Sequence, residues 1–433
     1  MNRSRLEFWL REEIAGPVVK VLQPVLYLFA FVWRRLLVRT TVIGITGSLG
    51  KTTAKESLAY ILAMEGRTFR SYQNQNNTAM VVLNILRIRP WHRYAVIEVA
   101  GSAPGLMTRS ARLLRPDVAI VLNVRRTHST AFTDMERYAA EKAELFAAVK
   151  PGGVVVMNDD DPLVSGMAVP TGTRVHRFGT AESAEYRMSS VSAVWPRRLG
   201  FVFHHGDQSR KIETQLVGEH WLTSAGAVLT ASLALGVSLD HAALALRDAE
   251  PFAARLQPME LPSGAIILRD DNNGSIDTIE ASLKVLSEAK AGRKLLVMTD
   301  ISDFGNQRRS NRLRYLGTRS AAVADVVVFI GIAADHGVRG ATEAGMPATN
   351  AHAFPSLRAA AEFLRGELRA GDLVLLKGRG SDHTARLFFA QLGDVACWKE
   401  YCAKRMLCDT CWELGVSRNE AAMAKLVAVP LAD

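Results

Sequence analysis

Short, almost continuous apolar runs alternate with stretches of helical period along most of the chain after residue 40. The first four runs are TVIGIT (41–46), YAVIEVA (94–100), VAIVLNV (118–124) and GGVVVMN (152–158). Strands that are apolar on both faces are typical of parallel sheets covered by helices on both sides. Helix-period stretches at 53–64 and 135–149 lie between the runs. The pattern therefore predicts an α/β domain with a mostly parallel sheet.

The pattern begins again after a Pro/Phe-containing joint near Pro251. Its second set of runs is GAIILRDD, KLLVMTD, DVVVFIG and DLVLLKG. We expect a second, smaller, Rossmann-like domain built on these strands. Between the two sets, residues 174–211 are less regular and are expected to form short strands or loops of the first domain, followed by a helix at about 220–235. The expected divisions are an N-terminal segment 1–40, a central domain 41–250, a C-terminal domain 251–395 and a tail 396–433.

The N-terminal segment is the most apolar part of the chain. Its cleanest apolar run has ten residues, whereas a bilayer span needs about twenty. No small-residue cleavage site follows, so we do not expect a secretory signal. We favour an interfacial anchor with Trp33 at the boundary and with Arg34, Arg35 and Arg39 facing anionic lipid. A helix docked on its own protein and a true membrane span are the alternatives.

Composition narrows the class of protein. With 433 residues, 48% hydrophobic and 22% charged, the chain is long and apolar enough for ordinary globular packing. Four cysteines exclude a disulfide scaffold. The net charge is +10, and the first forty residues hold seven Lys/Arg against three Glu. No stripe of interleaved aromatic and basic residues accompanies this charge, so we do not expect nucleic-acid binding.

The sharpest motif is GITGSLGKT at 44–52, between the first strand and a helix. This is the setting of a phosphate-binding loop, in which glycines bring backbone N–H groups to the phosphates and a lysine reaches the β and γ oxygens. A threonine hydroxyl after the lysine can bind Mg²⁺. Ile45 stands where the common pattern has glycine. The predicted nucleotide contacts are Gly47, Ser48, Gly50, Lys51, Thr52 and Thr53.

The glycine spacing of this loop resembles that of the Mur ligase superfamily, and within it the branch that adds D-alanyl-D-alanine to the peptidoglycan precursor. The resemblance covers about residues 41–395 and includes further motifs in the same order. These are SYQNQNNTAM (71–80), YAVIEVAG (94–101), NVRRTHS (123–129), EKAELF (141–146) and LVGEHWLTSAGAVLTA (216–231), the last with Ser224 where asparagine is usual. The resemblance implies an ATP-dependent amide ligase that works through an acyl phosphate.

The resemblance also implies roles for single residues. Thr52, Glu98, His128 and a carbamylated Lys142 would hold Mg²⁺, and the catalytic residues would be Lys51, His128, Lys142 and Arg255. For Glu98 the chemistry points the same way, because a carboxylate at the C-terminal end of a parallel strand can bind a hard cation. A forked, permanently charged guanidinium suits the γ-phosphate, so Arg255 is the candidate for that contact.

Two stretches of the second domain resemble family motifs less closely. Residues 268–278 read LRDDNNGSIDT, one residue shorter than the family pattern and without its Tyr and Pro. Asn272 and Asn273 are the candidate adenosine contacts, and an ordinary Asn/Gly turn is the alternative. Lys377 and Arg379 lie in the basic turn KGRGS, which we expect to bind a carboxylate of the amine substrate.

The ends of the chain depart from the family. Peptidoglycan-building members carry a UDP-sugar-binding domain before the nucleotide loop, and the forty residues here are too few for it. This shorter plan is similar to folylpolyglutamate synthases and membrane-anchored poly-γ-glutamate synthases. The expected enzyme is a cytoplasmic ligase at the inner face of the membrane, using ATP, Mg²⁺, a small carboxylate and an amine. The alternative is an inactive nucleotide-binding scaffold of a membrane-associated biosynthetic complex.

All four cysteines lie within fifteen residues of the tail: Cys397, Cys402, Cys408 and Cys411. Four thiolates can hold a structural Zn²⁺ or an Fe–S cluster, although the first two gaps are wider than in a zinc ribbon. We favour a metal site, with free thiols or disulfides as the alternatives.

Overall fold

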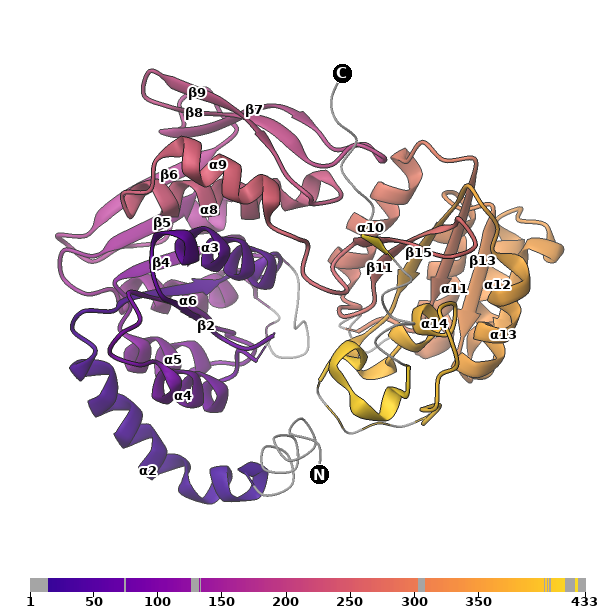
Figure 1. Cartoon of the computed structure of the whole chain (residues 1–433), viewed down its shortest axis with the longest axis horizontal. Helices are drawn as coiled ribbons and strands as arrows, with labels where there is room; N and C mark the ends of the chain where they lie inside the picture. Colours follow the sequence, from indigo (N-terminus) through magenta and orange to yellow (C-terminus); the bar gives the residue numbers. More distant parts are fainter. Residues whose placement is uncertain are drawn as a thin grey trace. The chain divides into compact units, whose positions relative to one another are not determined.

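The computed structural model describes residues 15–73, 75–125, 132, 134–302, 308–400, 402, 404, 406–416 and 425–426. The chain divides into two compact units (Figure 1). The first unit comprises Met1–Ser192, Leu199–Gln215 and Glu219–Glu250, and the second comprises Ala193–Arg198, Leu216–Gly218 and Pro251–Asp433. Each unit is built on its own sheet.

The first unit contains a nine-stranded sheet in the order β2-β3-β1-β4-β5-β6-β7-β8-β9. Neighbouring strands from β2 to β7 are parallel, and β7, β8 and β9 pair antiparallel. The strands are β1 (Thr41–Thr46), β2 (Thr68–Arg70), β3 (Tyr94–Glu98), β4 (Val118–Val121), β5 (Val154–Asn158), β6 (Arg174–Gly179), β7 (Tyr186–Ser192), β8 (Gly200–His205) and β9 (Gln208–Glu213). The irregular stretch at 174–211 thus extends the same sheet.

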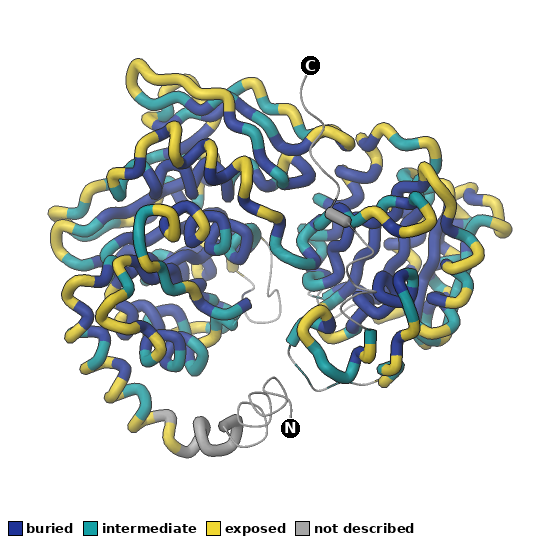
Figure 2. Tube along the Cα trace, in the orientation of Figure 1, coloured by how far each residue is buried: buried dark blue, intermediate teal, exposed yellow. Residues whose placement is uncertain are grey.

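Helices cover both faces of this sheet. The helices are α2 (Ala15–Leu36), α3 (Lys51–Glu65), α4 (Thr78–Arg87), α5 (Leu106–Leu114), α6 (Met135–Ala147), α7 (Pro162–Ser165), α8 (Leu222–Ala234) and α9 (Leu239–Asp248), with a short 3-10 turn η2 (Glu219–Trp221). α3, α8 and α9 pack together, and α4, α5 and α6 form a second layer. β3, β4 and β5 are buried along their whole length (Figure 2), as expected for strands covered on both faces.

α2 is docked on the outer side of α4 and α5. Leu26 and Ala30 pack on the core of that layer. The Trp33 indole donates to the Ile88 carbonyl at 2.9 Å, and the Arg34 guanidinium, 2% exposed, donates to the Leu114 carbonyl at 2.6 Å. The expectation that Arg34 faces lipid is therefore wrong, because its guanidinium is buried and bonded to the first unit. Trp33, expected at the boundary, also bonds to its own protein. Among the described residues, no helix has the length and hydropathy of a membrane span.

The second unit contains a seven-stranded sheet in the order β14-β13-β12-β15-β11-β10-β16. It is parallel from β14 to β11, and β11, β10 and β16 pair antiparallel. The strands are β10 (Gln257–Glu260), β11 (Ile266–Asp270), β12 (Arg293–Met298), β13 (Val326–Ile330), β14 (Ala351–Phe354), β15 (Asp372–Lys377) and β16 (Lys425–Leu426). The helices are α10 (Ile276–Glu288), α11 (Arg309–Ala321), α12 (Ala334–Glu343), α13 (Leu357–Glu367) and α14 (Ala385–Phe389), with 3-10 turns η3 (Ala348–Asn350), η4 (Gly380–Asp382), η5 (Cys408–Thr410) and η6 (Trp412–Leu414).

Two apolar cores hold this sheet. Leu268, Leu296 and Phe329 belong to one, and Ile267, Val297 and Val328 to the other, so alternate residues of the same strands face opposite sides. Both units are α/β with mostly parallel sheets, which confirms the fold class predicted from the apolar runs.

Candidate active site

The phosphate loop connects β1 directly to α3, which begins at Lys51. Gly50 precedes the helix with φ +84°. A Cβ at this position would lie 2.2 Å from Ser224 Oγ, and Ser224 Oγ donates to the Gly50 carbonyl at 3.3 Å. Only glycine fits here, and the serine that replaces the usual asparagine closes on the loop. The first turn of α3 directs its N–H groups and its positive dipole end to the loop, as phosphate binding requires.

The amide of Asn123 clamps the same loop. Its Oδ1 accepts from the backbone N–H of Ser48 at 3.1 Å and of Leu49 at 2.9 Å. The Lys51 ammonium donates to the carbonyls of Gly47 at 2.7 Å and Ser48 at 3.1 Å. The cation thus lies over the loop, where phosphate oxygens can replace neutral carbonyls as acceptors. Asn123 belongs to the NVRRTHS motif. Its contact with the phosphate loop could not be predicted from the sequence, because it depends on β4 lying beside β1.

Two of the predicted Mg²⁺ ligands are in contact. Thr52 Oγ1 donates to Glu98 Oε2 at 2.9 Å, because β1 and β3 are parallel neighbours with Ile45 paired to Glu98. Asn76 Nδ2 donates to the other carboxylate oxygen at 2.7 Å. Glu98 is 1% exposed. A hydroxyl and a buried carboxylate beside a phosphate loop fit the oxygen ligands that Mg²⁺ prefers.

Lys142 lies in α6 and is 1% exposed. Its ammonium is 3.9 Å from the centre of the Tyr138 ring. Burial lowers the pKa of Lys142 to about 7, and only the neighbouring Glu141 acts in the opposite direction. A large share of this lysine is therefore neutral near pH 7, which is the form that reacts with CO₂. His128, the other predicted ligand, lies outside the described residues.

Thr53 and Ser48 complete the predicted set in the first unit. Thr53 is buried, and its hydroxyl has no hydrogen-bond partner among the described residues. Ser48 Oγ donates to the Arg125 carbonyl at 3.1 Å. Ser48 therefore contributes to the shape of the loop through both its backbone and its side chain.

In the second unit, Arg255 lies on a strained segment. Its two neighbours, Ala254 and Leu256, are buried and have φ values of +61° and +49°. Positive φ is costly for non-glycine residues and is found most often at functional sites. Arg255 Nε is buried without a hydrogen-bond partner among the described residues. The structure thus holds a guanidinium in a set position with hydrogen-bonding capacity left over.

The turn after β11 and the turn after β15 lie against each other. A Cβ on Gly274 would lie 2.6 Å from the Arg379 side chain, and one on Gly380 would lie 3.1 Å from Asn272 Oδ1. Asn272 Nδ2 is buried without a partner among the described residues, whereas Asn273 Oδ1 accepts from the Ser275 N–H at 3.0 Å. The two second-domain motifs are therefore brought together. Asn272 thus has a buried amide donor that a ligand could satisfy.

Lys377 is fully buried and ion-paired with Asp270. The two residues are directly opposite each other at the ends of β15 and β11. Ser282 Oγ also donates to this carboxylate at 2.6 Å. Burial lowers the pKa of Lys377, and Asp270 opposes that shift. Lys377 was predicted to bind a carboxylate of the substrate. Its charge is instead compensated by the carboxylate of Asp270, which belongs to the protein itself.

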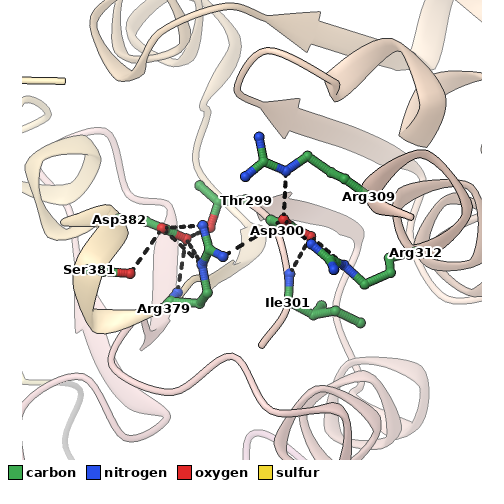
Figure 3. A network of polar contacts seen from close by, with 8 residues as sticks. All are labelled: Thr299, Asp300, Ile301, Arg309, Arg312, Arg379, Ser381 and Asp382. Carbon is green, nitrogen blue, oxygen red and sulfur yellow. Dashed lines mark hydrogen bonds and ion pairs between the residues drawn. The ribbon is translucent and has the colours of Figure 1, made fainter. Parts of the chain in front are cut away.

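A cluster of arginine side chains that remains accessible surrounds Asp300, which follows β12 (Figure 3). Asp300 accepts from Arg309 at 3.0 Å and from Arg312 at 2.7 Å, both on α11. Arg379 lies 3.7 Å from the same carboxylate and 2.7 Å from Asp382. Among the described residues, three arginines lie against two aspartates here. Of these residues, Arg379 was predicted from the sequence, whereas Asp300, Arg309 and Arg312 were missed.

The tail packs on the second unit through Asp409 and Cys408. Asp409 binds the buried Arg269 at 2.6 Å, and Arg269 also contacts Asp271 at 3.3 Å. The four cysteines are free thiols and line one small cavity with His383. Among the described residues, however, no three His, Cys, Asp or Glu side chains are grouped so that they could hold a metal ion. The predicted Zn²⁺ or Fe–S site is therefore not supported.

A phosphate loop with a Thr–Glu pair beside it is the arrangement of an enzyme that uses ATP and Mg²⁺. The chain matches the Mur ligase middle domain over residues 45–232 and the Mur ligase glutamate ligase domain over residues 254–380. It is 30% identical over 377 residues to the UDP-N-acetylmuramoyl-tripeptide--D-alanyl-D-alanine ligase of Mycobacterium bovis, covering 82% of this chain and 74% of that one. The chain belongs to the Mur ligase family.

Other relatives agree with this assignment. The Escherichia coli K12 ligase of the same name is 28% identical over 301 residues, or 69% of this chain and 66% of that one. A crystal structure of MurF from Acinetobacter baumannii has a TM-score of 0.76 at 25% identity, covering 84% of this chain and 79% of that one. MurF from Thermotoga maritima in complex with ADP shares the fold, with a TM-score of 0.69 at 24% identity over 82% and 80% of the two chains. The family resemblance expected from the motifs is confirmed, and none of these relatives favours the inactive scaffold.

Proposed function

We propose that this chain activates a carboxylate substrate as an acyl phosphate and joins it to the amino group of an amino acid or short peptide. The observation that carries the proposal is the contact of Thr52 with Glu98 beside a phosphate loop that ends in Lys51. The proposed cofactors are ATP and Mg²⁺. Because ATP is the energy source, we propose that the enzyme acts in the cytoplasm.

In the first step a carboxylate oxygen attacks the γ-phosphorus, and the bond from that phosphorus to the β–γ bridging oxygen breaks to release ADP. The main obstacle is the approach of an anion to the negatively charged triphosphate. Lys51 and the loop N–H groups would lower this repulsion, and Arg255 would contact the transferred phosphoryl group. Mg²⁺ bound by Thr52 and Glu98 would supply further neutralisation of the phosphate oxygens.

A carbamate on Lys142 would convert this buried amine into a further carboxylate for the same metal site. The proposal rests on the burial that lowers the pKa of Lys142 to about 7. Carbamate formation uses the neutral amine and releases a proton, so a buried lysine with a lowered pKa is a suitable acceptor. His128 is proposed as a further ligand.

In the second step the amine nitrogen attacks the acyl carbon, phosphate leaves with its bridging oxygen, and the nitrogen loses a proton. We propose that the arginines around Asp300 bind a carboxylate of the amine substrate. Arg309, 51% exposed, and Arg379, 29% exposed, are accessible to such a ligand. Asn272, with a free amide donor against the Arg379 turn, would contact the adenosine. D-alanyl-D-alanine, named in the relatives' function, is the first amine to test.

The direct test is an oxygen-18 experiment. Candidate carboxylates labelled with oxygen-18 are incubated with ATP, Mg²⁺ and D-alanyl-D-alanine, and the released phosphate and the product are weighed by mass spectrometry. An acyl phosphate transfers one labelled oxygen from the carboxylate to phosphate. Amide product without label in the phosphate would exclude the acyl phosphate, and ATP hydrolysis that is independent of every carboxylate and amine would exclude ligase activity.

A further inference from the structure

The outer side of α2 carries an exceptional group of exposed apolar side chains. Fifteen large hydrophobic side chains are exposed among the described residues, and eight of them lie within the 17 residues from Leu22 to Val38. They are Leu22, Val25, Leu28, Phe29, Phe31, Val32, Leu36 and Val38. Monomeric proteins rarely leave such a contiguous apolar surface in water without a binding function.

The helix that carries this apolar surface is fixed on the first unit, so the surface cannot turn inward. The inner side of the helix is already used, because Leu26, Ala30 and Leu37 pack on the core of the first unit. Arg34 is buried and bonded to two carbonyls and to Asp117. The outer residues are therefore held in a fixed row that faces away from the unit.

The surroundings of α2 are strongly basic. Residues 22–40, 78–93 and 105–117 contain nine arginines and a single acidic residue, Asp117. That aspartate is occupied by Arg34 at 3.1 Å and by Lys150 at 2.8 Å. Seven of the arginines are exposed: Arg39, Arg87, Arg89, Arg93, Arg109, Arg112 and Arg115. The three segments therefore carry a net positive charge.

Two arginine side chains lie against aromatic side chains of α2. The Arg35 guanidinium is 3.1 Å from the centre of the Phe31 ring, and the Arg109 guanidinium is 5.6 Å from the Tyr27 ring. An apolar row with flanking arginines matches a bilayer interface, where acyl chains accept the row and phosphate groups accept the arginines. A twofold pair of this chain would instead place the same arginines against each other.

We propose that the outer face of α2 binds an anionic phospholipid surface, with Leu28, Phe29 and Val32 entering the acyl boundary and the neighbouring arginines contacting lipid phosphates. The contact is peripheral. This location goes beyond the ligase function, since it concerns a surface that the proposed chemistry does not use.

The test uses the full chain and sedimentation with vesicles. One set is phosphatidylcholine alone, and the other contains about one third phosphatidylglycerol, which gives a negative surface. We expect at least about tenfold tighter binding to the anionic vesicles, weakened by added salt. Equal binding to both vesicles, or binding to neither, would overturn the proposal.

Single variants separate the apolar and the charged contributions. Phe29→Asp, at a side chain 63% exposed, should weaken vesicle binding about tenfold or more, since it replaces an inserted ring with a charge. The matched control is Ile332→Asp, at a side chain 93% exposed in the second unit, which should bind like the wild type. Arg109→Gln should weaken binding to anionic vesicles about fivefold and leave binding to neutral vesicles unchanged.

Light scattering distinguishes the alternative occupant. If the chain is a dimer that Phe29→Asp dissociates, and neither form sediments with anionic vesicles, the face is covered by a second copy and the lipid proposal is wrong. ATP-dependent turnover with soluble substrates should be the same for wild type and Phe29→Asp, which shows that the variant remains folded.

Discussion

The phosphate loop of the first unit and the basic turn of the second use their lysines in opposite ways. Lys51 donates to two carbonyls of its own loop, which are neutral acceptors that phosphate oxygens can replace. Lys377 is buried against Asp270, and Arg379 is bound to Asp382. A lysine in a phosphate loop can thus donate to neutral groups of the loop itself, whereas a lysine in a similar strand-end motif can be ion-paired within the protein. The residue type is the same in both motifs, so only the group that each lysine contacts distinguishes them.

The largest expected effect is that of Lys51→Ala. Loss of the cation over the phosphate loop should lower kcat by about 10³-fold or more, because transition-state charge is left uncompensated. The thermal midpoint should change little, since Lys51 is only half-buried. Lys211→Ala, at a side chain 66% exposed in β9, is the matched control and should keep wild-type turnover. If the kcat of Lys51→Ala were within about tenfold of the wild-type value, Lys51 would not be the cation that compensates the phosphate charge, and the contrast with Lys377 would be lost.

The predictable part of the structure is the part that is encoded locally. Apolar runs predicted both sheets because a strand covered on both faces needs consecutive apolar residues. The phosphate loop was predicted because its glycines, lysine and threonine are adjacent in the sequence and its contacts are largely backbone. Glu98 could be assigned because it ends a strand, and parallel strands end at the same edge of a sheet.

The parts that could not be predicted depend on contacts between distant segments. Asn123 clamps the phosphate loop from another strand, and Asp300 gathers arginines from a helix nine and twelve residues later and from the turn after β15. Neither has a periodicity or a motif of its own. The inward orientation of Trp33 and Arg34 was missed for the same reason: an amphipathic pattern does not say which polar atoms the docking side will satisfy.

The second prediction concerns stability, and Lys377→Met tests it. Removing one partner of a buried ion pair leaves an uncompensated carboxylate and should lower the free energy of unfolding by about 3–5 kcal/mol. Urea denaturation measures this loss. The double variant Lys377→Met with Asp270→Asn should regain at least about half of it, because the stranded charge is gone. If Lys377→Met unfolds like the wild type and only the KM for the amine rises, the lysine is a ligand group after all.

A smaller effect is expected at the arginines around Asp300. Arg312→Gln should raise the KM for the amine substrate by about tenfold to a hundredfold with little change in kcat, since a charge-assisted hydrogen bond contributes about 1.5–3 kcal/mol. Steady-state kinetics with varied amine measure it. Arg314→Gln is the matched control, because Arg314 lies on the same helix but is 56% exposed and paired with Glu343. Equal KM values for the two variants would show that the group around Asp300 does not bind the amine.

The smallest expected effect concerns the protonation of the buried Lys142, which we compare with the buried Lys377. Burial lowers the pKa of Lys142 to about 7, and burial also lowers the pKa of Lys377, but there the paired Asp270 opposes the shift. Between pH 7 and its ordinary value of 10.5, Lys142 binds fewer protons in the folded than in the unfolded chain, so its contribution to stability rises with pH in that window. Below pH 7 the folded protein has to accommodate a buried charge.

The neutral form is also the one that accepts CO₂, so the carbamate should follow the same titration. With ¹³C-bicarbonate, the carbamate signal of Lys142 should be at least about tenfold weaker at pH 6 than at pH 8, because a pKa of about 7 gives about tenfold less neutral amine at pH 6 and carbamate formation also releases a proton. The signal should be absent in Lys142→Met, because the amine that forms the carbamate has been removed. A signal that persists in Lys142→Met would mean that a different amine reacts, and then burial without a counter-charge would not be what distinguishes the two lysines.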